Sequence, residues 1–205
     1  MTKILKSKYK ISRRLGVSLW GGAKDPFLSK NYPPGQHGAS VQRRKTDHGT
    51  QLHAKQKLKG YYGYITEKQF FRTFQEAHRM RGNASENLIG LLEKRLDAVV
   101  YRLNLAPTIF AARQIVNHKH ILVNGKTVNI PSYSVKDNDV IELKEKSRTM
   151  PIAMEATQKM ERTIPSYLSF EPKDMKGTFL RIPNLADVPY PCIMEPHLII
   201  EFYSK

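Results

Sequence analysis

The sequence has few acidic residues, one cysteine and no long apolar run. Only 18 Asp and Glu stand against 34 Lys and Arg, which leaves a net charge of +16. A surplus of this size repels itself unless phosphates or acidic lipids neutralise it, so it indicates a polyanionic partner. Because Cys192 is the single cysteine, an internal disulfide and a cysteine-rich zinc site are excluded. No apolar run approaches the ~20 residues of a membrane span.

The start of the chain also lacks the basic, apolar and small-residue succession of a secretory signal. We therefore expect a soluble, cytoplasmic protein. What is present is an ordinary globular composition, with 40% hydrophobic and 25% charged residues in a chain of 205. That length and composition are enough for one or two domains with packed cores.

The positive charge is concentrated in the N-terminal part. Residues 1–92 carry 18 basic and 5 acidic side chains, residues 93–158 carry 10 and 7, and residues 159–205 carry 6 and 6. Residues 1–50, the basic arm, are also rich in Gly and Pro and can bury little apolar surface alone. We predict that the arm is extended and orders against its partner. Its interleaved aromatic residues suit base stacking or packing, whereas a merely solvated tail does not need them; they are Trp20, Phe27 and Tyr32.

Helical signals follow the basic arm. Three lysines crowd a short segment that ends at Gly60, and Thr66 with Gln69 is spaced as a capping pair for the next helix. That helix has a core face at helical spacing and a stop at Gly82; the face consists of Phe70, Phe71, Phe74 and Ala77. A third helix is predicted from a cap at Ser85 to about Leu105.

The pattern then changes from helical to alternating. A short helix is predicted over Ile109–Asn117, and Asn124-Gly125 between two apolar segments is a strong signature of a two-residue type I′ hairpin. Further strands are expected around Tyr133–Val135 and Val140–Leu143. The apolar run Leu198–Phe202 is predicted to be a buried strand that packs back on the N-terminal helices.

The predicted fold class is therefore α+β. A mostly helical domain is formed by residues 51–92 plus 159–205, and residues 93–158 form an inserted helix-helix-sheet module. Residues 1–50 remain as the extended basic arm. The inserted module is near the lower size at which a core stands alone.

The helix-helix-hairpin order brings several donors to one face of the module. Arg95 and Arg102 lie two helical turns apart, Arg113 projects from the second helix, and more donors cluster at the hairpin. Arg clamps phosphate with two donors, whereas Asn or neutral His bonds a ribose hydroxyl or a base edge. Solvated charges on an outer helix face are the alternative interpretation of the two helix arginines.

The segment RLDAVVYRLNLAPTIFAARQIVNHKHILVNGKTVNIPSYSVKDNDVI, Arg95 to Ile141, resembles the RNA-binding module of the bacterial-type S-four family of small-subunit ribosomal proteins. The module alone occurs in several RNA-binding enzymes. The flanking segments make the resemblance specific and extend it over essentially the whole chain; they are YPPGQHG at 32–38, QLHAKQKLKGYYG at 51–63, ENLIGLLEKRLD at 86–97 and IIEFYSK at 199–205.

The resemblance implies a non-enzymatic primary rRNA-binding protein that nucleates assembly of the small-subunit body and influences translational accuracy. The implied partners are small-subunit rRNA, ribosomal protein S-five with other small-subunit proteins, and mRNA where it enters the subunit. No cofactor and no metal are expected. The residues predicted to bind RNA are Arg13, Arg14, Arg43, Arg44, Lys45, Lys55, Lys57, Lys59, Arg95, Arg102, Arg113, Gln114, His118, Lys119, His120, Asn124 and Lys126.

Two positions in the module depart from the family pattern. Ile109 stands where many relatives have Arg, and Lys119 stands where many have Gly. The resemblance therefore implies one phosphate contact fewer at the first position and one more at the second. Some relatives also have a four-cysteine zinc site in the arm, which this arm lacks.

An RNA-modifying enzyme of the pseudouridine-synthase type is the alternative function, because it uses the same module for docking. Its catalytic residue would be Asp97, but the surrounding sequence lacks the loop pattern of that nucleophile. Neither a Walker-type glycine loop nor a standard zinc spacing of His residues is present. Cys192 and His197 are bracketed by prolines and have no evident orienting group, so a catalytic dyad is not predicted.

Overall fold

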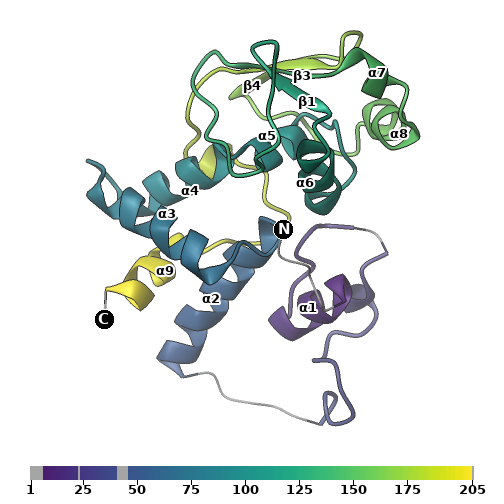
Figure 1. Cartoon of the computed structure of the whole chain (residues 1–205). Coiled ribbons are helices and arrows are strands. Elements are labelled where there is room, and N and C mark those ends of the chain that lie inside the picture. The colour runs from purple at the N-terminus through teal and green to yellow at the C-terminus, as the bar shows by residue number, and fades with distance from the viewer. Residues whose placement is uncertain (1–6, 23, 41–45, 205) are drawn as a thin grey trace. The chain divides into compact units, whose positions relative to one another are not determined.

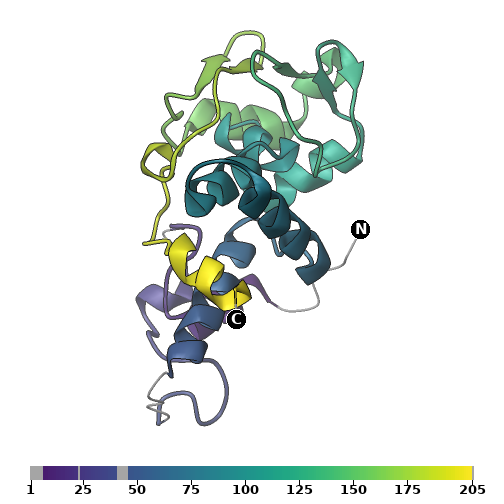
Figure 2. The same cartoon turned by 90° about the vertical axis from the view of Figure 1, so that its left-hand side faces the viewer.

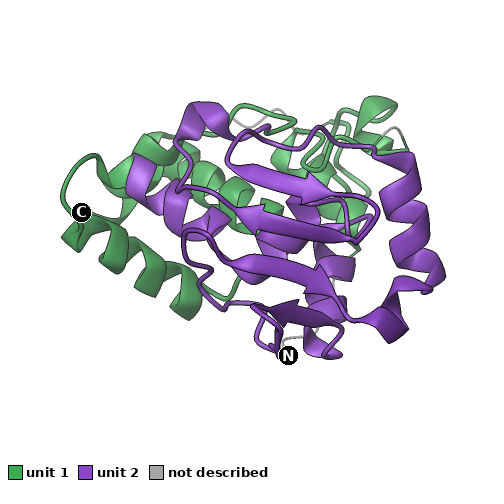
Figure 3. Cartoon of the chain, turned by 90° about the horizontal axis from the view of Figure 1, so that it is seen from above, with its two compact units in different colours: residues 1–85, 190–205 green, residues 86–189 purple. Residues whose placement is uncertain are grey.

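The computed structural model describes residues 7–22, 24–40 and 46–204. The chain forms two compact units, coloured separately in Figure 3. Unit 1 consists of Met1–Ser85 with Tyr190–Lys205, and unit 2 is the continuous segment Glu86–Pro189. The chain therefore leaves unit 1 once, forms unit 2 and returns.

Unit 1 is helical in its described part. Its elements are α1 (Lys8–Leu15), the 3-10 turn η1 (Pro26–Leu28), α2 (Asp47–Tyr61), α3 (Glu67–Arg79) and α9 (Pro196–Tyr203). The predicted Thr66 cap is confirmed, because its side chain accepts a hydrogen bond from the Gln69 backbone N–H. Figures 1 and 2 both show α9 beside α2, which is the main helix-helix contact of this unit.

The basic arm is less extended than predicted. Ile11, Leu15 and Leu19 are buried, and α1 ends where Gly16 adopts a left-handed φ of 66°. The Trp20 indole donates to the Tyr61 carbonyl at 3.2 Å. The arm thus forms an amphipathic helix that packs within unit 1, because its few apolar residues recur at helical spacing.

The C-terminal strand prediction is wrong, because Leu198–Phe202 lies within the helix α9. Pro196 occupies the first helical position, where its fixed φ and missing N–H suit a helix start. Ile199 is buried, and the ring of Phe202 lies under the Lys55 ammonium at 4.2 Å. A short apolar run alone does not distinguish a buried strand from a buried helix.

Unit 2 combines helices with one antiparallel sheet. The helices are α4 (Ala84–Glu93), which begins at the unit border, α5 (Leu96–Arg102), α6 (Ile109–Asn117), α7 (Glu145–Arg148), α8 (Pro151–Lys159) and the 3-10 turn η2 (Leu185–Asp187). The strands are β1 (Ile121–Val123), β2 (Lys126–Thr127), β3 (Val140–Leu143), β4 (Leu168–Glu171) and β5 (Lys176–Phe179). They lie in the order β2-β1-β3-β5-β4. In Figure 3 the strands face the viewer.

The helix predicted from Ser85 to Leu105 is two helices, α4 and α5. Arg95 between them has extended backbone angles and forms a β-bridge with Ser134. The Leu96 N–H donates to the Tyr133 carbonyl, and the Val135 N–H donates to the Lys94 carbonyl. The predicted strand at Tyr133–Val135 is reduced to this single bridge, which interrupts the helix.

The type I′ hairpin prediction is confirmed. Asn124 and Gly125 have φ of 50° and 74°, and Val123 pairs with Lys126 across them. Positive φ at both central residues is the condition of this turn, and Asn-Gly meets it at the least cost.

The sheet extends beyond the residues assigned to the module from composition. β5 pairs with β3, and β4 pairs with β5, so residues 168–179 complete the sheet. Gly177 fits here because an added Cβ would lie 2.5 Å from a Leu103 methyl group. The structure therefore places residues 159–189 in unit 2. The predicted end of the module at Gln158 follows the change in charge along the chain, which carries no information about strand pairing.

Candidate nucleic-acid interface

The end of α6 and the β1–β2 hairpin expose a cluster of polar and basic side chains. We call this cluster the hairpin patch; it consists of Gln114, His118, Lys119, His120 and Lys126. All except the half-buried His120 are exposed. Within the described residues, neither lysine of the patch forms an ion pair with a carboxylate. Their charges are therefore available to an external anion.

Lys119 has an unusual backbone conformation, with φ of 65°. The His120 N–H donates to the Ile115 carbonyl and the Lys119 N–H to the Val116 carbonyl, which together close α6 as a Schellman motif. Glycine is the preferred residue at this position, so a lysine here carries a conformational cost. The chain places a charged side chain at the patch despite that cost.

The imidazole of His120 lies inside the patch rather than at its surface. Its Nδ1 is 2.8 Å from the Ser147 hydroxyl, and its ring centroid is 6.1 Å from that of His118. Burial, followed by the positive neighbours His118 and Lys144, lowers the pKa of His120. A neutral ring at pH 7 exchanges hydrogen bonds with hydroxyl groups without adding charge.

Asn124 braces the hairpin instead of pointing a free amide outward. Its amide donates to an Asp139 carboxylate oxygen at 2.8 Å, and its carbonyl accepts from the Val140 N–H at 2.9 Å. The other Asp139 oxygen accepts from the Lys136 N–H at 2.7 Å. Asn124, which was predicted to bind RNA, therefore has a structural role, because it fixes the hairpin to the turn before β3.

Two of the predicted arginines share one buried carboxylate. Asp97, 1% exposed, accepts from Arg95 at 2.7 and 3.0 Å and from Arg113 at 3.0 and 3.2 Å. Asp97 thus holds both guanidinium groups within hydrogen-bond distance of a single carboxylate. Arg113 retains 16% side-chain exposure, and Arg95 retains 8%. Arg113 is therefore the more exposed of the two guanidinium groups.

Arg102 lies in the interior of unit 2. It is 3% exposed and makes a two-pronged contact with the fully buried Glu93 at 2.8 and 3.0 Å. Glu93 also accepts a hydrogen bond from the Tyr167 hydroxyl at 2.7 Å. The helical position that suggested a phosphate contact instead supplies a core ion pair.

The three lysines of α2 are also paired within the protein. Lys55 and Lys59 both contact Glu67 at 2.7 Å, and Lys57 contacts Glu195 at 2.9 Å. Lys55 and Lys57 are each 6% exposed. These contacts attach α3 and the C-terminal segment to α2, so this part of the predicted site serves the fold.

Of the residues of the basic arm that were predicted to bind RNA, the structure describes Arg13 and Arg14. Arg13 donates to the Tyr32 and Pro33 carbonyls and lies 4.8 Å from the centre of the Tyr32 ring, whereas Arg14 is exposed. Arg43, Arg44 and Lys45 lie outside the described residues.

A further basic row lies on α3 and was missed by the sequence analysis, which followed the apolar side of this helix. The row consists of Lys68, Arg72 and Arg79, all of them exposed. Their spacings of four and seven residues bring them to one side of a helix. Periodicity of charge, tested in the same way as periodicity of apolar residues, would have found it.

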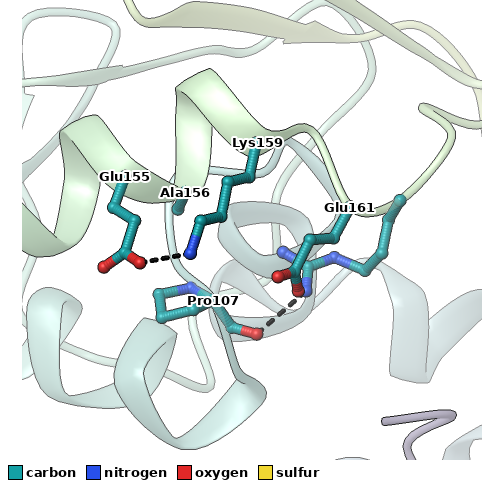
Figure 4. Close-up of a pocket in the computed structure, with 6 residues that line it drawn as sticks. Pro107, Glu155, Ala156, Lys159 and Glu161 are labelled. Atoms are coloured by element: carbon teal, nitrogen blue, oxygen red, sulfur yellow. Dashed lines mark hydrogen bonds and ion pairs between the residues drawn. The ribbon is translucent and has the colours of Figure 1, made fainter. Parts of the chain in front are cut away.

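Unit 2 also contains a small open hollow, shown in Figure 4, which bears on the enzyme alternative. Arg162 at its edge donates to the Ala106 and Pro107 carbonyls and lies 4.0 Å from the centre of the Tyr101 ring. Glu155 and Lys159 on its other side contact each other. Asp97 does not line this hollow, and both of its oxygens are engaged by arginines.

Three further observations concern the described residues only. No helix among them combines the length and the apolar character needed to cross a bilayer. No group of three or more His, Cys, Asp or Glu side chains in the same ranges is arranged to hold a metal ion. Burial raises the pKa of the Cys192 thiol, which disfavours the nucleophilic thiolate.

Comparison with known proteins covers the whole chain. Residues 3–93 match the family described as ribosomal protein S4/S9 N-terminal domain, and residues 94–141 match the S4 domain. The chain is similar over its full length to proteins named small ribosomal subunit protein uS4. It is 62% identical to the protein of Paramagnetospirillum magneticum, 60% to that of Gluconacetobacter diazotrophicus and 58% to that of Dinoroseobacter shibae, with 100% of each chain covered.

Proposed function

Because the chain belongs to the uS4 family of small-subunit ribosomal proteins, we propose that it is a structural constituent of the small ribosomal subunit and binds its rRNA. It is a non-enzymatic protein, as its family is. The net charge of +16 is consistent with a phosphate-rich partner of this kind. Its place of action is the ribosome in the cytoplasm.

The hairpin patch is the observation that carries the proposal within unit 2. Lys119 and Lys126 supply charge for phosphates, and Gln114, His118 and His120 supply hydrogen bonds for ribose hydroxyls or base edges. The braced Asn124-Gly125 turn holds the hairpin tip in one conformation. Such a surface recognises RNA mainly by shape, because phosphate contacts fix position without encoding sequence.

The Arg95–Asp97–Arg113 cluster is the second part of the proposed RNA-binding surface in unit 2. Asp97 acts as a positioning residue, because its carboxylate holds both guanidinium groups. Arg113 is the more exposed of the two guanidinium groups, and a guanidinium can contact a phosphate with two donors. Arg102, Lys55 and Lys57 are left out of the surface because their charges are neutralised inside the protein.

The basic arm supplies a second RNA-binding surface in unit 1, through Arg14 and the Arg43–Lys45 triplet. Two linked surfaces bind more tightly than either alone, because the second contact forms at a high effective concentration. A protein that holds two RNA segments in this way favours folding of a junction, which is the basis for the proposed role in nucleating assembly. Influence on translational accuracy and contacts with ribosomal protein S-five and incoming mRNA are proposed from family membership.

The pseudouridine-synthase alternative requires a free catalytic carboxylate. Asp97 accepts from two arginines and from the Ala98 N–H, and it lies 1% exposed in the interior. A carboxylate in that position has neither an open approach for a base nor an unengaged oxygen. The structural role of Asp97 therefore has the stronger support.

The test is a salt titration of binding to a small-subunit rRNA junction. If about 8 phosphates are neutralised, the slope of log K against log salt is near about −7 for a duplex-like site. The variant Lys119→Gln with Lys126→Gln should bind roughly tenfold more weakly, with a slope shallower by about 2, and should keep its helical circular dichroism.

A matched control separates contact from net charge. Lys159 and Arg181 are exposed but paired with Glu155 and Asp187, so Lys159→Gln with Arg181→Gln removes the same two charges away from the patch. We expect this control to bind nearly as tightly as the natural protein. Equal weakening of both variants, or a flat salt response of the natural protein, would overturn the proposed surface.

A further inference from the structure

We propose that the row of Lys68, Arg72 and Arg79 on α3 is an additional contact for an RNA phosphate backbone. The inference rests on the proposed function and adds a third contact region to it, on a helix that the sequence analysis treated as core alone.

The three cations share one side of the helix. At 3.6 residues per turn, Lys68, Arg72 and Arg79 fall within about 40° of one another around the axis of α3. Phe70, Phe74 and Ala77, which are buried, lie on the opposite side. The row extends about 16 Å along the axis, at 1.5 Å per residue. A straight row of this length can follow several successive phosphates of one RNA strand.

The charges of the row are not used by the fold. In the part of the chain that the structure describes, no ion pair or hydrogen bond involves the side chains of Lys68, Arg72 or Arg79. Glu76 lies beside them on the same helix, yet it forms no ion pair with Arg72 or Arg79 in the described ranges. Lys55 and Lys59 of the neighbouring helix, in contrast, are both held by Glu67.

The face around the row favours RNA over a protein partner. Stable protein interfaces have an apolar centre, usually with an aromatic anchor. The nearest candidate, Phe71, is 39% exposed, but its ring packs against Phe74 and Tyr203 with centroids 6.1 and 5.3 Å apart. On this side of the helix the exposed residues are therefore the three long cations with Gln75 between them, and Glu76 lies at the edge of the row. Charge complementarity identifies the occupant as a polyanion.

The experiment replaces two members of the row. Lys68→Gln with Arg72→Gln keeps helix propensity, because Lys, Arg and Gln are comparable helix formers. Binding to protein-free small-subunit rRNA is measured across salt concentrations, and the RNA backbone is mapped by hydroxyl-radical protection. We expect roughly tenfold weaker binding, a slope shallower by about 2 and loss of protection over one short backbone stretch. Adding Arg79→Gln should extend that loss.

The control is again Lys159→Gln with Arg181→Gln, which lowers the net charge equally. If the α3 variant binds and protects as the control does, the row is a solvated helix face and the inference is wrong. If the α3 variant is impaired only when other small-subunit proteins are present, the row docks an acidic protein and the inference is also wrong. Failure of the natural protein to bind rRNA would instead overturn the proposed function itself.

Discussion

Lys55 of α2 and Lys126 of β2 are the same residue type in two different roles. Lys55 is 6% exposed, contacts Glu67 at 2.7 Å and lies over the Phe202 ring. Lys126 is exposed at the hairpin tip, and no ion pair to it is present in the described ranges. A lysine on α2 stabilises the protein, whereas the lysine on the hairpin is available to an external anion, which we propose is RNA.

The difference shows that the number of basic residues in a segment does not locate an RNA-binding surface. What decides is whether a carboxylate lies within reach after folding. Arg102 with Glu93 and Lys57 with Glu195 are neutralised by partners 9 and 138 residues away. The hairpin patch and the α3 row have no such carboxylate partner in the described part of the chain. Three predictions test this contrast.

The largest effect on stability is expected at the buried ion pair of Glu93 and Arg102. Glu93→Gln leaves the Arg102 charge in the core without a counter-charge, which should lower the free energy of unfolding by about 3 to 5 kcal/mol. Urea denaturation followed by circular dichroism measures it. The control is Glu155→Gln, which disrupts the exposed contact with Lys159 and should leave the midpoint unchanged. An unshifted midpoint for Glu93→Gln would mean that the pair is not a stabilising one.

A smaller effect on stability should appear at acidic pH, where Glu67 becomes protonated. Burial opposes ionisation of Glu67, but hydrogen bonds from Lys55, Lys59 and Tyr203 outweigh it and lower its pKa from 4.5 to about 2. Since the folded pKa is below the unfolded one, this stabilisation is present above pH 4.5 and is lost as the pH falls towards 2. After allowance for the exposed side chain, it amounts to about 1 to 2 kcal/mol.

The variant Glu67→Gln tests the origin of that acid sensitivity. It should be less stable than the natural protein at pH 7 and should lose less stability between pH 4.5 and pH 2. Thermal unfolding across that range compares the two. A natural-like pH dependence in the variant would assign the acid sensitivity to other carboxylates.

The smallest effect concerns an exposed cation. Lys119→Gly relieves the left-handed backbone at φ 65° and should raise the free energy of unfolding by about 1 kcal/mol while weakening RNA binding. Lys119→Ala removes the same charge without relieving the backbone, so it should weaken binding equally and give no stability gain. Urea midpoints and rRNA titrations of both variants separate the two contributions. The contrast with Lys55 requires that Lys119→Gly change the two quantities in opposite directions, so that the free energy of unfolding rises and the affinity for RNA falls.

Much of the local structure could be predicted from local signals. The Thr66 cap, helix α6 and the Asn124-Gly125 hairpin are confirmed because each depends on residues a few positions apart. The break between α4 and α5 could not be predicted, since it depends on a bridge to Ser134. The apolar run Leu198–Phe202 does not by itself distinguish a strand from a helix, and its helical signal lies outside the run, in Pro196 at the first position of α9.

The candidate site was predicted as a set of cations without their counter-charges. In the hairpin patch Gln114, His118, Lys119 and Lys126 are exposed, whereas His120 is half-buried. Local helix-end and turn signals are enough to predict that these residues lie near one another. Arg102 and the lysines of α2 differ, because a helical position gives a side chain its direction but does not reveal what packs against it. Their partners Glu93, Glu67 and Glu195 are all present in the sequence, and only the fold brings them close.

The contact between Asn124 and Asp139 has a kinetic consequence. A hairpin that is already fixed to the turn before β3 loses little conformational freedom when it meets RNA, so few encounters fail for lack of the right loop shape. Removing that side-chain contact by Asp139→Ala leaves every cation in place and should still slow productive association with the proposed RNA partner. Rigidity at the tip of the hairpin thus contributes to the rate of association with the partner as well as to the affinity.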